Sequence, residues 1–94
     1  MDFFLKLMKA LANETRLDII QHLIEDKQLS LEDIVKCINR PYKTIAGHLK
    51  ILERSGLLKS HRWKGEVLYS LNASSTMYYN RQLVGLVRRR IRRK

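Results

Sequence analysis

The segment from Pro41 to Gly56 constrains the fold more than any other part of the chain. Ile45, Leu49 and Leu52 follow one another at the spacing i, i+4, i+7, which places three apolar side chains on one side of a helix. Pro41 suits the first turn of this helix because its missing N–H would have no partner there in any case. Gly56 follows the periodic part and is typical of a helix end. The segment therefore predicts an amphipathic helix that is anchored by its apolar side.

The other side of this helix is basic and carries small residues. Glu53 is the only acidic residue between Pro41 and Gly56. Gly47 lies in mid-helix, where glycine costs about 1 kcal/mol relative to alanine, so the missing side chain favours close approach to another surface. An apolar back and a basic front fit the major groove of DNA, although an ordinary solvated face has the same polarity. The predicted DNA contacts here are Arg40, Tyr42, Lys43, Thr44, Ala46, Gly47 and Lys50.

The basic residues are concentrated in two parts of the chain, whose formal net charge is +10. Residues 1–39 contain more acidic than basic side chains, whereas residues 40–64 contain seven basic side chains and one acidic one. Residues 88–94 add six more basic side chains. These two blocks favour a polyanionic partner, with nucleic acid as the first candidate. The tail at 88–94 either contacts the DNA backbone, faces a partner or only keeps the chain soluble.

Helical patterns also precede the central segment. Residues 3–11 form one, and Asn13 is typical of the N-cap of a second helix, after which residues 25–28 indicate an exit turn. Ser30 and Asp33 resemble a capping box at the start of a short third helix. A tight turn then leads into the basic helix, which is the pattern of a helix-turn-helix. The buried stripe expected in the second helix is Leu17, Ile20, Leu23 and Ile24.

After the central helix the hydrophobic period changes from 3.6 to 2. This change predicts two strands, 57–63 and 66–71, around a two-residue turn at Lys64-Gly65. Such a turn pairs Leu58 with Leu71, Ser60 with Tyr69 and Arg62 with Val67 on one face of the hairpin, which seals the core. The tip of the hairpin is then expected to project outward.

Three residues at this tip are candidate DNA contacts. We expect Arg62 and Lys64 to contact phosphate, and an arginine here can also reach into a narrow minor groove. Trp63 either contacts DNA as well or packs over Leu68 or against a neighbouring subunit.

The patterns together predict an α+β fold that is mainly α, namely a winged helix-turn-helix with about five helices and a two-stranded hairpin. The last helix is expected from about Thr76, and residues 1–94 are expected to form a single domain. No apolar run approaches the ~20 residues of a membrane span. With no signal-peptide pattern and the lone cysteine Cys37, the expected location is cytoplasmic, without a membrane partner.

Three motifs resemble the ArsR-type winged-helix transcriptional regulators. Residues 7–23, LMKALANETRLDIIQHL, resemble the family's LKALADPTRLRIL segment, and residues 44–59, TIAGHLKILERSGLLK, are similar to its recognition helix, TVSxHLxxLxxAGLV. Residues 66–72, EVLYSLN, resemble the returning strand of its wing. Three motifs in the family's order are far more specific than one alone.

The resemblance implies a homodimer that represses transcription by occupying operator DNA. In the family the first and last helices join the two subunits, which correspond here to residues 2–11 and 76–92. The expected dimer interface is formed by Phe3, Phe4, Leu7, Tyr79, Leu83 and Leu86.

The chain departs from the metal-sensing members of this family. Their Cys-x-Cys motif at the start of the third helix is replaced by Ser30-Leu31-Glu32, and residues 75–94 contain no His, Asp, Glu or Cys. Transition metals need such ligands in a cluster. We therefore expect no metal and no cofactor.

The histidines and the cysteine are expected to have structural roles rather than catalytic or metal-binding ones. His48 borders the apolar stripe and is expected to be a packed, hydrogen-bonded histidine. Cys37 is expected to be a buried and inert thiol, with a redox role as the alternative. His22 and His61 lie on other elements, so no catalytic constellation forms and an enzyme is not expected.

The sequence thus predicts a regulator that binds double-stranded DNA sequence-specifically, as a homodimeric repressor without a metal-sensing site. Two alternatives remain at this point. One is an architectural protein that coats DNA without an operator, and the other is a winged helix that binds a protein partner instead of DNA.

Overall fold

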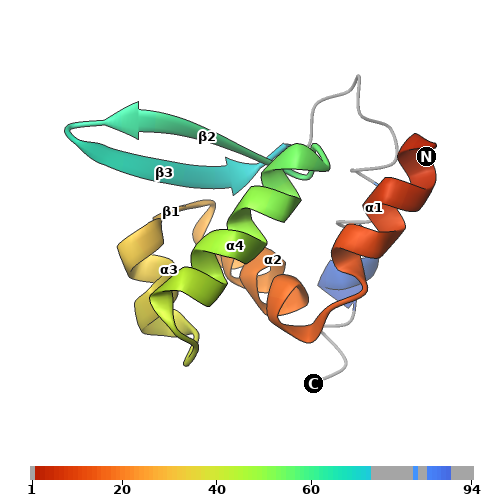
Figure 1. Cartoon of the computed structure of the whole chain (residues 1–94), viewed down its shortest axis with the longest axis horizontal. Coiled ribbons are helices and arrows are strands. Elements are labelled where there is room, and N and C mark those ends of the chain that lie inside the picture. Colours follow the sequence, from red (N-terminus) through yellow and green to blue (C-terminus); the bar gives the residue numbers. More distant parts are fainter. Residues whose placement is uncertain (1, 73–81, 83–84, 90–94) are drawn as a thin grey trace.

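A computed structural model describes residues 2–72, 82 and 85–89 of the chain, apart from the side chain of Phe3. In chain order the elements are α1 (Phe3–Leu11), α2 (Glu14–Asp26), β1 (Gln28–Ser30), α3 (Leu31–Cys37), α4 (Tyr42–Arg54), β2 (Leu58–Trp63) and β3 (Glu66–Leu71). Residues 82 and 85–89 are also helical, and the predicted start of a last helix at Thr76 lies outside the described residues. The α4 helix crosses the middle of the molecule between α1 and α3, and the β2–β3 hairpin projects from the side away from α1 (Figure 1). The predicted fold class is confirmed.

The helix starts follow the capping residues. The side chain of Asn13 accepts a hydrogen bond from the Arg16 backbone N–H at 3.1 Å, which confirms the N-cap of α2. Ser30 and Asp33 form the predicted capping box, each side chain accepting from the backbone N–H of the other. Pro41 caps α4 with its backbone in an extended conformation, one residue before the helical turn in which we expected it. These local signals fix where the chain turns.

The sheet has three strands in the order β1-β3-β2, so the prediction of a two-stranded hairpin was incomplete. The register of β2 with β3 is the predicted one, with Leu58 opposite Leu71 and Arg62 opposite Val67. Gln28, predicted to lie in an exit turn, begins β1 and pairs with Ser70. A three-residue strand is too short to show alternation in the sequence, and it forms because β3 offers a second edge.

The core lies between the helices and the root of the hairpin. The predicted stripe of α4 is confirmed, because Ile45, Leu49 and Leu52 are each fully buried. In α2 the fully buried residues include Ile19, which we did not expect, whereas Leu17 and Ile24 are only partly buried. The difference arises because α2 is covered by α1, α3, α4 and the sheet, so its buried arc is wider than one stripe. No helix in the described part of the chain is long and apolar enough to cross a membrane.

Candidate nucleic-acid interface

The predicted reading face of α4 lies on the outside of the molecule. The side chains of Lys43, Thr44 and Lys50 are exposed, that of Tyr42 is 52% exposed, and Ala46 is half-buried. Because the opposite side of α4 is locked into the core by three fully buried side chains, the exposed side is held in a fixed orientation. The fold therefore brings the predicted contacts of α4 onto one accessible surface.

The turn before α4 and the end of α4 complete this surface. Arg40 is exposed and its Nη1 donates to the Asn39 carbonyl oxygen at 2.8 Å. Glu53 accepts a hydrogen bond from the Ser60 hydroxyl at 2.6 Å, which ties the end of α4 to strand β2. The carboxylate that could oppose a polyanion is thus engaged with the root of the hairpin.

Gly47 has no packing role inside the described part of the chain. A Cβ atom built at this position meets nothing within 4 Å, although glycine weakens a helix interior. At this exposed position a bare backbone would let a binding partner approach closely.

The tip of the hairpin presents an aromatic ring and two cations. Lys64 and Gly65 both have positive φ, +50° and +82°, as the two central residues of a tight hairpin turn require. The Lys64 ammonium lies 5.6 Å from the centroid of the Trp63 ring, and Trp63 is 59% exposed. Arg62 is also exposed, so the structure leaves all three predicted contacts accessible. The sequence also allowed Trp63 to pack over Leu68, but at 59% exposed this side chain stays largely open to solvent.

His48 belongs to the packing between helices. Its Nδ1 lies 3.3 Å from Nη1 of Arg16, whose Nε donates to the Ala10 carbonyl oxygen at 2.6 Å. Arginine can only donate, so Nδ1 accepts and the ring is neutral in this contact. Burial and then the Arg16 charge lower the pKa of His48 below its ordinary value. The arrangement agrees with the expected packed, hydrogen-bonded histidine, but sequence reasoning missed Arg16, whose partners become neighbours only in the fold.

Cys37 is exposed, and the expectation of a buried thiol was wrong. It is the last residue of α3, and the buried positions around it are taken by Ile34 and Ile38. Within the described residues, no three side chains of His, Cys, Asp or Glu are grouped as a metal ion would need.

The six predicted dimer residues are placed unequally. Leu7 is fully buried in the chain's own core, which leaves its side chain no surface for a partner. Phe4 is 45% exposed and Leu86 is 55% exposed. The side chain of Phe3 and the residues Tyr79 and Leu83 lie outside the described part of the structure. Of the six predicted residues, Phe4 and Leu86 are the described ones whose side chains are exposed.

Comparison with known proteins places the chain among transcriptional regulators. The sequence model of the family described as "Helix-turn-helix domain" matches residues 11–61. An uncharacterized HTH-type regulator of Methanocaldococcus jannaschii, MJ1398, is 33% identical to this chain. The match covers 65% of this chain but only 16% of the length of MJ1398. The repressor PagR of Bacillus anthracis is also 33% identical, over 71% of the chain and 67% of its own length.

A solved structure shows the same architecture. The homodimeric winged helix-turn-helix DNA-binding domain of Mb0332 from Mycobacterium bovis has a TM-score of 0.79 and 25% sequence identity, over 93% of this chain and 76% of that one. These similar proteins are regulators rather than enzymes, in agreement with the sequence-based expectation.

Proposed function

The chain belongs to the ArsR-like helix-turn-helix transcriptional regulators, and we propose that it acts as a homodimeric repressor that binds operator DNA. The observation that carries this proposal is the reading face of α4, which we define as Tyr42, Lys43, Thr44, Ala46, Gly47 and Lys50. It is basic and accessible, and the buried back of the same helix fixes its orientation. A face of this shape can enter the major groove and present lysines to guanine edges and phosphates.

The hairpin supports the same function. Exposed Arg62, Trp63 and Lys64 stand at its tip, on an element that projects away from the body (Figure 1). In the proposed complex α4 occupies the major groove while the tip reaches the neighbouring backbone or minor groove. Two subunits would then read the halves of an inverted repeat about one helical turn apart.

The central test removes the two lysines of the reading face. Lys43→Ala with Lys50→Ala is expected to weaken binding to a selected duplex by at least roughly 30-fold at fixed salt, since removing one side chain that reads a base costs about 1–3 kcal/mol. Fluorescence anisotropy measures the affinity, and circular dichroism checks the fold. Lys6→Ala with Lys9→Ala, on α1, removes the same charge and is expected to change affinity by no more than about threefold, because distant charges are screened. An equal loss in both variants would refute the reading face.

Sequence specificity is tested by selecting bound duplexes from a random pool. A regulator should bind its selected site roughly 10³-fold or more tightly than random DNA. Equal affinity for both would favour the architectural alternative, in which the chain coats DNA without an operator.

Regulation without metal is the remaining part of the proposal. It rests on Ser30-Leu31-Glu32 in place of a Cys-x-Cys motif and on the lack of His, Asp, Glu and Cys in residues 75–94. Operator affinity is expected to be the same in EDTA and in micromolar Zn²⁺. A metal-dependent change in affinity would contradict it.

A further inference from the structure

A pocket of about 490 Å³ lies between α1 and the second half of α4, outside the reading face. Its lining consists of Lys6, Lys9, Ala10, Arg16, Ile51, Arg54 and Ser55. The volume falls in the range of about 300–1,000 Å³ that is typical of small-molecule sites. The size alone therefore suits a small organic molecule.

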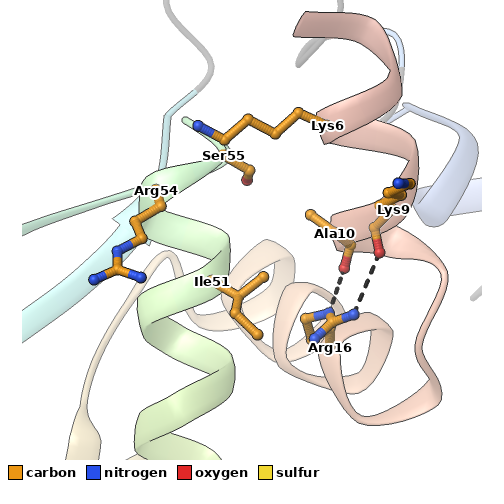
Figure 2. A pocket seen from close by; sticks show the side chains of 7 residues that line it. All are labelled: Lys6, Lys9, Ala10, Arg16, Ile51, Arg54 and Ser55. Atoms are coloured by element: carbon orange, nitrogen blue, oxygen red, sulfur yellow. Dashed lines mark hydrogen bonds between the residues drawn. The ribbon is translucent and has the colours of Figure 1, made fainter. Parts of the chain in front are cut away.

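The pocket is positively charged and has no acidic lining residue among those described. Lys6 extends from α1 toward Ser55, and Arg16 lies at the bottom, where it donates to the Ala10 and Lys9 carbonyl oxygens (Figure 2). The guanidinium of Arg54 points away from these groups, so Arg54 belongs to the rim (Figure 2). Lys6, Lys9 and Arg16 place three positive charges in the lining with no carboxylate among the described lining residues, and an anion in the pocket is attracted to them.

Two acidic residues that are close in sequence to Lys6 and Arg54 make hydrogen bonds outside the pocket lining. Asp2, four residues before Lys6, caps α1 by accepting from the Leu5 backbone N–H at 3.0 Å. Glu53, next to Arg54, accepts from Ser60. No Asp or Glu follows Glu66 in the sequence, so the undescribed residues between 73 and 94 have no acidic side chain to offer. Within the described part of the chain no carboxylate lines the pocket, so an anion from another molecule can lie among its cations.

Arg16 still has donors for such a molecule. Three of its five N–H groups have a partner, since its Nε and Nη2 donate to α1 carbonyls and its Nη1 to His48. These contacts hold the guanidinium in place between α1 and α4. A fixed guanidinium whose other two N–H groups have no partner among the described residues is suited to a carboxylate.

Ile51 gives the α4 side of the pocket an apolar surface beside Arg54 and Ser55. Ile51 points from α4 toward α1, is 42% exposed, and lies across from Ala10 (Figure 2). A DNA phosphate gains nothing from such a surface, whereas the hydrocarbon part of an organic acid buries against it. We propose that this pocket binds a small amphipathic carboxylate, with the carboxylate held by Lys6, Lys9 and Arg16 and the apolar part lying on Ile51 and Ala10.

The test uses octanoate as the probe, with ¹⁵N-labelled protein and no DNA present. Octanoate is expected to shift the amide signals of Ala10, Ile51 and Ser55 with a saturable dependence on concentration. Octanol and octylammonium, which have the same chain without the negative charge, are expected to shift these signals weakly. Equal shifts by all three probes, or no saturable shift by octanoate, would overturn the proposal.

Variants locate the binding site. Lys6→Gln with Lys9→Gln is expected to weaken octanoate binding about tenfold or more. Lys36→Gln with Lys59→Gln removes two exposed lysines elsewhere and should leave the binding unchanged. Ile51→Ser, at a partly exposed position, is also expected to weaken it. Equal affinity in the two double variants, or an unaffected Ile51→Ser variant, would overturn the assignment. Because no DNA is present, either result leaves the proposed regulatory function untouched.

Discussion

At the scale of single residues, the free protein and the proposed DNA complex favour different side chains at Gly47. Nothing within 4 Å fills the space in which its Cβ would stand, so alanine fits the free protein and supports the helix better. A DNA groove wall close to the backbone would exclude the same methyl group. The two states therefore favour different residues at this position.

Gly47→Ala is accordingly expected to raise the free energy of unfolding by about 0.5–1 kcal/mol. The same change should weaken operator binding roughly tenfold, because an overpacked contact costs about 1–3 kcal/mol. Urea unfolding and fluorescence anisotropy on the same preparations measure the two effects. A variant with higher stability and unchanged affinity would show that the backbone at Gly47 does not approach the DNA.

His48 makes the stability of the chain depend on pH. Burial and the Arg16 charge lower the pKa of His48 in the folded state, whereas in the unfolded chain it is about 6.5. The unfolded state therefore binds more protons below that value, and folding becomes less favourable there. The contribution is fully present above about pH 6.5 and is lost as the pH falls through the unfolded and then the folded pKa.

His48→Asn removes this titration and keeps an oxygen that can accept from Arg16. Wild-type protein is expected to lose more stability than the variant between about pH 7.5 and 5.5, as measured by urea unfolding. His22 and His61 are present in both proteins, so their contributions cancel in the comparison. Identical losses would show that His48 titrates as it does in the unfolded chain.

At the scale of elements, α4 and the hairpin have different parts in the proposed complex. The three buried side chains of α4 anchor it in the core, while β2 and β3 extend a turn of two positive-φ residues into solvent. A contact made by an anchored helix can discriminate between bases. A contact made by a projecting tip is better suited to the DNA backbone, where it adds affinity with little base preference.

Arg62→Gln with Lys64→Asn tests this division, since asparagine tolerates the positive φ that Lys64 adopts. Affinity should fall similarly for selected and random duplexes. The slope of log K against log salt should become shallower by about 0.9 for each phosphate that the variant no longer neutralises. Binding isotherms at several salt concentrations measure this slope. A loss of affinity confined to the selected duplex would instead assign base reading to the tip.

At the scale of the whole molecule, the proposed homodimer would cover exposed apolar side chains on α1 and on residues 85–89. Phe4 is 45% exposed and Leu86 is 55% exposed. Phe4→Ser with Leu86→Ser is expected to yield a folded monomer in analytical ultracentrifugation, with reduced affinity for an inverted repeat. Trp63→Ser, which removes an exposed aromatic ring on the hairpin, should remain dimeric. A dimeric double variant would place the interface elsewhere.

Sequence reasoning succeeded for several features whose signal was local. The caps at Asn13 and Ser30, the stripe of α4 and the register set by Lys64-Gly65 depend on residues close together in the chain. It failed where the answer depended on distant partners. The strand β1 needs the free edge of β3, and Cys37 is exposed because its neighbours Ile34 and Ile38 face the core.

The candidate site shows the same difference between features with a local signal and features that depend on distant residues. The outward placement of the residues proposed for the reading face and the hairpin tip could be predicted from the sequence, because helix and hairpin periodicity decide which side chains face outward; their contact with DNA stays a prediction. The basic pocket was not identifiable, since α1 and α4 supply its lining from segments forty residues or more apart.

The sequence by itself therefore determined the helices α1 to α4, the β2–β3 hairpin, and the buried side and basic face of α4, because periodicity, capping and turn chemistry act over a few residues. Tertiary structure decided which elements meet. It buried Leu7 within the chain, placed Arg16 between Ala10 and His48, and gathered cations from α1, α2 and α4 around one pocket. Those contacts join residues that become neighbours only after the helices have packed. They therefore produce no periodic pattern in the sequence from which they could be predicted.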